Sequence, residues 1–87
     1  MKIKEGFVLR EVAGSYVVVA VGKAVKTFNG IINLNDTGAF LWKQLEKGSN
    51  LDGLKSALLA EYDVDEEIAE RDAKKFLDKV TEAGLVE

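Results

Sequence analysis

The clearest cluster of chemical groups in the sequence is "DVDEE", Asp63–Glu67, where four carboxylates crowd into five positions. Such a cluster could hold a cation or supply a general acid–base pair. Calcium loops, however, need a longer D-x-D-x-D-G spacing, which is absent here. Acidic residues are also favoured at the start of a helix, where they complement its dipole. We therefore interpret this cluster as a capped helix start.

A second polar group, Asn35, Asp36 and Thr37, directly follows the apolar run "INL". It could form a catalytic turn, but the sequence offers no obvious second polar group aimed at the same point. Asn, Asp and Thr are also the residues that end a strand and cap a helix. We predict a structural joint at this position.

A third set, Ile68, Asp72, Lys75 and Lys79, follows the spacing i, i+4, i+7, i+11. On a helix these residues form one row, which lies beside the apolar stripe and not opposite it. Such a row is usually a solvated border. Next to an open strand edge it could instead form one wall of a groove, and the spacing alone leaves both readings open.

The amino-acid composition excludes several kinds of catalytic and metal-binding site. The 87 residues include no Cys and no His, which excludes a thiolate nucleophile, a zinc–sulfur site and a triad base. We expect no catalytic residue, no metal ligand and no cofactor, and we rank a small carboxylate-only hydrolase low. The net charge of −3 disfavours nucleic acid, since phosphate binding needs clustered, unopposed Lys and Arg.

Length and hydropathy set the context. A chain of 87 residues predicts a single domain, residues 1–87. No apolar run approaches the ~18 residues that cross a bilayer, and the start "MKIKEGF" lacks the apolar core of a signal peptide. We expect a cytoplasmic protein that does not bind membranes.

The segments before Asn35 are typical of short strands. "YVVVAV" is almost unbroken and apolar, as expected of a strand that is central in its sheet or covered on both faces. Asn29-Gly30 is a strong hairpin signal. The predicted strands are Phe7–Val12, Tyr16–Val21, Ala24–Phe28 and Ile31–Leu34. These give an antiparallel sheet of three or four short strands.

Three helices are predicted after Asn35, which makes the fold class α+β. Their expected bounds are Asp36–Lys47, Leu51–Tyr62 and Glu66–Ala83, capped by Asn35, Asn50 and Asp65. Their apolar stripes are Gly38, Leu41, Trp42 and Leu45; Leu51, Leu54, Leu58 and Tyr62; and Ala69, Ala73, Phe76, Leu77 and Val80. We expect Trp42 in the core. Phe40 points away from its stripe, and we favour a helix buried on two sides over an exposed aromatic.

The residues also carry a family resemblance. "LNDTGAFLW", Leu34–Trp42, resembles the signature L-N-[ED]-T-a-a-x-[IL]-W of PqqD-like proteins. The resemblance continues through "L..ALLAEYDVDEE" and "D..KFLDKV" to the closing "GLVE", Gly84–Glu87. It covers the chain from about Ile31 to the end, and the N-terminal strands more loosely.

This resemblance implies a winged-helix-like fold and a non-catalytic role as a recognition element for precursor peptides made by the ribosome. Members of the family hold the leader of the precursor and deliver it to a modifying enzyme, often a radical SAM protein. The leader adds as a strand to the last strand and lies against the third helix. If Ile31–Leu34 is that edge, the residues expected to bind the peptide are Ile31, Ile32, Asn33, Leu34, Ile68, Asp72, Lys75 and Lys79.

The family motif itself matches at Leu34, Asn35, Trp42, Asp72 and Leu77, of which all but Asp72 are expected to be structural. The groove positions of Lys75 and Lys79 extend the resemblance by helical spacing. Two alternatives remain open. A winged helix can also bind DNA or act as a regulatory module, and an open strand edge would allow a homodimer.

Overall fold

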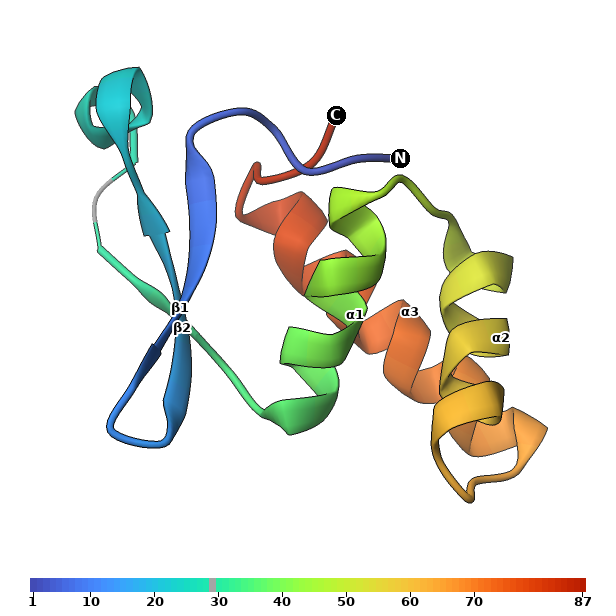
Figure 1. Cartoon of the computed structure of the whole chain (residues 1–87). Coiled ribbons are helices and arrows are strands. Elements are labelled where there is room, and N and C mark those ends of the chain that lie inside the picture. Colours follow the sequence, from blue (N-terminus) through green and yellow to red (C-terminus); the bar gives the residue numbers. More distant parts are fainter. Residues whose placement is uncertain (29) are drawn as a thin grey trace.

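The computed structural model describes residues 1–28 and 30–87 and consists of a small sheet followed by three α-helices (Figure 1). Its elements are β1 (Phe7–Val12), β2 (Ser15–Ala20), the 3₁₀ helix η1 (Gly22–Lys26), β3 (Ile32–Leu34), α1 (Asp36–Glu46), α2 (Leu51–Glu61) and α3 (Glu66–Glu82). The α+β class and the three predicted helices are confirmed, and the sheet has three strands.

The sheet is antiparallel with the order β1-β2-β3. β1 and β2 are joined by Ala13-Gly14, whose φ angles of 52° and 81° are both positive, as a tight primed hairpin turn requires. β2 is the central strand and buries Val18 completely, which confirms the prediction for "YVVVAV". β3 is an edge strand, because β2 is the only strand with which it pairs in the described part of the chain.

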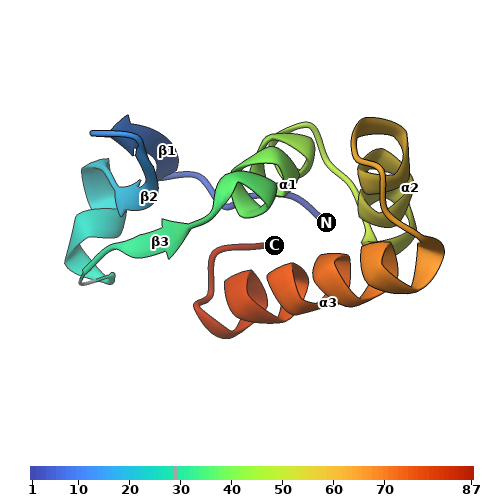
Figure 2. The same cartoon turned by 90° about the horizontal axis from the view of Figure 1, so that it is seen from below.

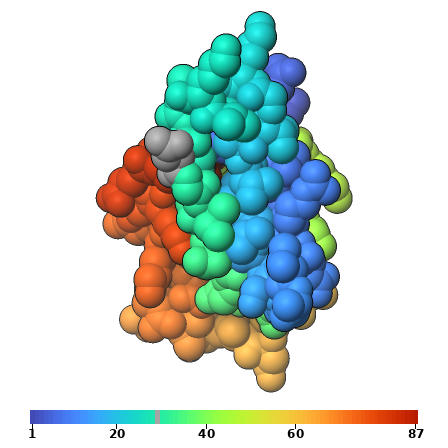
Figure 3. Space-filling view, turned by 90° about the vertical axis from the view of Figure 1, so that its left-hand side faces the viewer, coloured from blue at the N-terminus to red at the C-terminus, as the bar shows by residue number. Residues whose placement is uncertain are grey.

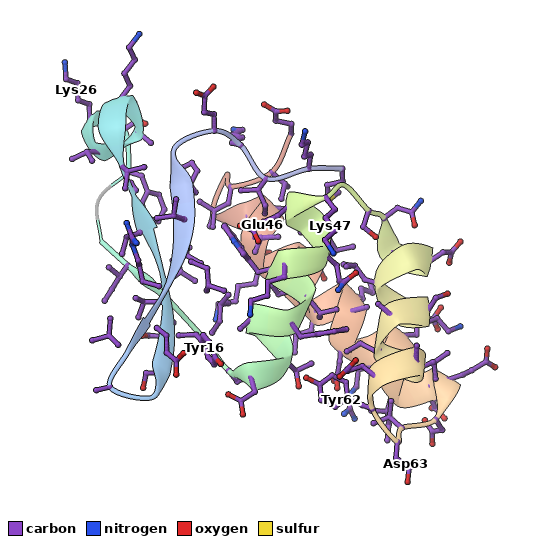
Figure 4. The ribbon with its side chains drawn as sticks, in the orientation of Figure 1. Tyr16, Lys26, Glu46, Lys47, Tyr62 and Asp63 are labelled. Carbon is purple, nitrogen blue, oxygen red and sulfur yellow. The ribbon has the colours of Figure 1, made fainter. Side chains whose placement is uncertain are left out.

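The predicted strand Ala24–Phe28 is wrong, because η1 occupies this segment. Gly22 turns the chain away from β2 at a φ of 61°, and the hydrogen bonds that follow are local, including Phe28 N to Ala24 O at 3.0 Å. Lys26 lies at the tip, far from the helices (Figure 4). No strand of the described sheet pairs with this segment, so its backbone hydrogen bonds are local. The predicted Asn29-Gly30 turn includes Asn29, which lies outside the described residues.

Each helix begins at its predicted cap. The side-chain oxygens of Asn35, Asn50 and Asp65 accept backbone N–H groups three residues later, at 2.7, 2.8 and 2.8 Å. A capping side chain satisfies one of the N–H groups that the first turn of a helix leaves without a partner. The helices therefore start where the sequence predicts, and each ends one residue earlier than expected.

The core lies among the three helices and one face of the sheet. Trp42 is fully buried, as predicted, and its Nε1–H has no hydrogen-bond partner among the described residues. Tyr62 does not belong to the buried stripe of α2: it is 36% exposed, because the helix has ended and its backbone is extended. Phe40 is half-buried and packs edge-to-face on Tyr62 with ring centroids 5.5 Å apart, a position between the two alternatives.

The two ends of the chain lie side by side (Figure 1). Leu85 is fully buried, and its carbonyl accepts the Lys4 N–H at 2.8 Å. Ile3 forms a β-bridge with Val86. The last residues therefore pack against the end of α3, where the Leu85 N–H donates to the Val80 carbonyl at 2.9 Å, and the first residues of the chain hold them there.

Candidate functional site

The open side of β3 lies beside the C-terminal half of α3. Figure 2 shows β3 running above that end of α3, and in Figure 3 the green surface of β3 lies between β2 and the orange-red α3. One hydrogen bond joins the two elements: the Lys79 Nζ donates to the backbone carbonyl of Asn33 at 2.8 Å. The tertiary structure therefore brings an edge strand and a helix, far apart in sequence, to one cleft.

The direction of this bond shows which backbone groups face the cleft. Along a strand the N–H and C=O pairs of successive residues point alternately to the two sides. Since the Asn33 carbonyl is reached from α3, the backbone of Asn33 points away from β2. Ile31 directly precedes β3 and is 59% exposed. The Asn35 carbonyl is already engaged, because it accepts the Ala39 N–H of α1 at 2.9 Å.

A cavity of about 210 Å³ opens where β3 meets α1 and α3. Its apolar lining comes from Leu34, Leu41 and Phe76, all of which belong to the buried core. Its polar lining consists of Asn35, Thr37, Asp72, Lys75 and Lys79, and Gly38 completes the wall. A cavity of about 150 Å³ takes up benzene, so this one has room for a bulky apolar side chain.

Both signs of charge lie at the mouth of this cavity. Asp72 is half-buried and accepts a hydrogen bond from the Arg71 Nε at 3.3 Å. Lys75 and Lys79 are exposed on the following turns of α3. The cleft therefore lacks the unopposed basic face that a DNA backbone requires, and suits a ligand that carries acidic and apolar groups.

The structure brings most of the predicted site residues together. Leu34, Asp72, Lys75 and Lys79 line the cavity, and Asn33 meets Lys79 at its entrance. Ile31 and Ile32 lie along the same edge, with Ile32 half-buried against the core. Their roles in binding stay predictions.

Ile68 is placed elsewhere. It lines a second hollow, formed with Leu51 of α2 and with the α3 residues Glu67, Glu70, Arg71 and Lys74. None of these residues lines the first cavity. Helical spacing aligned Ile68 with Asp72 and Lys75, but Ile68 lies near the start of α3, whereas Lys79, which meets β3, lies near its end.

The sequence did not single out several cavity residues. Asn35, Thr37, Gly38 and Leu41 were assigned to the joint or to the core, and Phe76 to the core. The sequence "LNDTG" did carry a signal for these cavity residues. Where a strand leads directly into a helix, the end of the strand and the first helical turn lie next to each other and face the element that packs on them. Figure 4 shows Tyr16 of β2 beside this corner. A third hollow runs from Tyr16 around the end of β3 to Asp36.

Among residues 1–28 and 30–87, no group of three or more His, Cys, Asp or Glu side chains is placed to hold a metal ion. No helix within these residues has both the length and the apolar character to cross a membrane.

Comparison with protein families identifies the chain. Residues 8–86 match the family described as "Coenzyme PQQ synthesis protein D (PqqD)". The chain belongs to the PqqD family. The resemblance seen in "LNDTGAFLW" is thereby confirmed, and the match extends to the N-terminal strands.

Solved structures extend the comparison. This PqqD-family chain is similar to TbiB1 in complex with the TbiA(beta) leader peptide, with a TM-score of 0.77 and 28% identity over 100% of this chain and 95% of that one. It is also similar to lasso peptide synthetase B1 complexed with the leader peptide, with a TM-score of 0.75 and 22% identity over 99% and 95% of the two chains. At 22% identity the second likeness concerns the fold alone. Comparison with curated proteins gave no match.

Proposed function

We propose that this protein is a non-catalytic adaptor that binds the leader segment of a ribosomally made precursor peptide by β-strand addition. The observation that carries the proposal is the open edge of β3 beside α3, with the backbone of Asn33 turned toward the cleft. Membership of the PqqD family and the likeness to TbiB1, which was solved with a leader peptide, support it.

Strand addition suits this edge on physical grounds. An edge strand presents backbone N–H and C=O groups that an extended peptide can satisfy, and these main-chain bonds give affinity. Here Ile31 and Asn33 would supply them. Alternate side chains of the peptide would point to the inner face, where the cavity beside Leu34 would take an apolar one.

The proposal includes a second partner. The bound leader would be presented to a modifying enzyme, such as a radical SAM protein, and residues 1–87 would act as one PqqD-like domain in the cytoplasm. In Figure 1, β1 and η1 lie on the opposite side of the molecule from α2, and an enzyme could approach there while the leader stays bound between β3 and α3.

The test is calorimetric titration of the folded protein with synthetic peptides that cover the short open reading frames beside its gene. We expect a dissociation constant in the micromolar range or tighter for one of them. A folded protein that binds none of these peptides would contradict the proposed function.

One pair of variants tests the mode of binding. Asn33→Pro removes an N–H that faces the cleft and not β2, so the sheet should form while the added strand loses a hydrogen bond and meets the proline ring. Asn33→Ala keeps the N–H and is the matched control. We expect at least about ten-fold weaker binding for the proline variant alone, since one lost backbone contact and a clash exceed about 1.4 kcal/mol. Equal binding by two folded variants would exclude strand addition at β3.

A further inference from the structure

The hydrogen bond between Lys79 and Asn33 occupies the place where a guest strand would bind. We infer that Lys79 guards the open edge of β3 in the empty protein, must be displaced by a guest strand, and thereby selects for acidic guests. This inference rests on the proposed function, because it concerns the regulation of the same cleft.

The geometry carries the first part of the inference. A guest N–H would approach the Asn33 carbonyl to about 2.9 Å along the open edge. The Lys79 Nζ already lies at 2.8 Å from that oxygen, and it comes from α3, which borders the edge. The lysine side chain therefore crosses the space that the guest backbone needs. Natural edge strands are often protected by lysines on the strand itself, whereas here the lysine comes from α3.

The charge of Lys79 is the reason to expect selection for acidic guests. Once displaced, the Lys79 ammonium loses its acceptor and remains near Lys75 in the same cleft. A guest carboxylate would replace the lost carbonyl with a stronger, charge-assisted hydrogen bond. A neutral guest offers no such replacement. A second copy of β3 would be a poor guest for the same reason, since Ile31, Ile32, Asn33 and Leu34 are uncharged.

The experiment compares three proteins with two peptides. The proteins are the wild type, Lys79→Met and Lys75→Met; the second variant makes the same change in the same cavity, at a lysine for which no hydrogen bond or ion pair is found among the described residues. The peptides are the leader that binds in the titration above and a version with every Asp and Glu replaced by Asn and Gln. Calorimetry gives the six dissociation constants.

The direction in which Lys79→Met changes the affinity for the neutral peptide decides whether Lys79 guards the edge. We expect it to bind Lys79→Met about two- to five-fold tighter than wild type, the worth of one exposed hydrogen bond that no longer has to be broken. Lys75→Met should not show this gain, and Lys79→Met should prefer the acidic peptide less than the wild type does. If the neutral peptide binds Lys79→Met no tighter than wild type, the guard role is wrong, although peptide binding itself would stand.

A measurement on the empty protein needs no peptide. The ammonium protons of Lys79, assigned by their loss in Lys79→Met, should exchange with water more slowly than those of Lys75 in ¹⁵N-resolved spectra. Equal exchange at the two lysines would show that the contact does not form in solution and would overturn the inference. Absence of leader binding by the wild type would instead overturn the proposed function.

Discussion

The helical part and the sheet of this protein differ in how they use their apolar residues. The helices supply most of the buried side chains, including Trp42, Leu45, Leu54 and Val80, each with no exposed surface. In the sheet only Val18 and Leu34 belong to the buried core, and Leu34 still has 8% of its surface exposed. Most of the buried apolar side chains therefore belong to the helices, and the sheet leaves one edge open.

α3 contributes side chains both to the core and to the cleft. Its apolar stripe, from Ala69 to Val80, packs into the core, while Asp72, Lys75 and Lys79 face the cleft. Substitutions on the first face should change stability, and substitutions on the second should change binding. The following experiments test that separation.

The largest effect is expected at the centre of the core. Trp42→Ala should lower the free energy of unfolding by about 3–5 kcal/mol, because it leaves a cavity where the indole ring was. Trp42→Phe should lower the free energy of unfolding by much less, since it retains an aromatic ring and removes the unpartnered Nε1–H. Urea denaturation measures both values. A loss for Trp42→Ala below that of surface variants would contradict the central role of the ring.

The next effect concerns the cleft. Lys75→Glu should weaken binding of an acidic leader by about ten-fold, equivalent to about 1.4 kcal/mol, because it places a carboxylate where a cation was. Asp72→Ala should also weaken the peptide complex. Calorimetry and denaturation should be run together, and the free energy of unfolding should change by less than about 0.5 kcal/mol in either variant. If Asp72→Ala unfolds the protein, the residue belongs to the stable region and not to the cleft.

A smaller effect should separate helix stability from binding. Asp65→Ala removes the cap of α3 and should cost about 1 kcal/mol of stability without altering leader affinity. Glu66→Ala is the matched control, since among the described residues Glu66 forms one ion pair, with the half-buried Lys55 at 3.7 Å, and the Glu66 carboxylate is mostly exposed, so that this pair contributes little. Thermal unfolding compares the two. Equal losses would mean that charge, and not the capping bond, supports this end of α3.

The smallest effect is expected in the sheet hairpin. Ala13 has a φ of 52°, a conformation in which Asn and Gly are less strained than Ala. Ala13→Asn creates Asn-Gly at the turn and should raise the free energy of unfolding by about 0.5 kcal/mol. Thermal unfolding against Ser15→Ala as a control would measure it. A decrease would show that the hairpin tolerates Ala13 for reasons other than its turn geometry.

The sequence by itself determined the helical part of this protein. Asn35, Asn50 and Asp65 mark the helix starts because a capping side chain bonds to its own first turn, an interaction local in sequence. The apolar spacing likewise identified the buried faces of α1 and α3, because one residue in three or four returns to the same side of a helix. The motif around Trp42 also identified the family.

Only the tertiary structure decided where the sheet ends and how the cleft is built. Residues 24–28 failed as a strand because a strand needs a partner elsewhere in the chain, which local composition cannot specify. For the same reason helical spacing could not tell Ile68 from Lys79: both lie in one row, but only Lys79 reaches β3. The open backbone of Asn33 and the lysine that meets it are consequences of how β3 and α3 pack, and no local pattern carries that information.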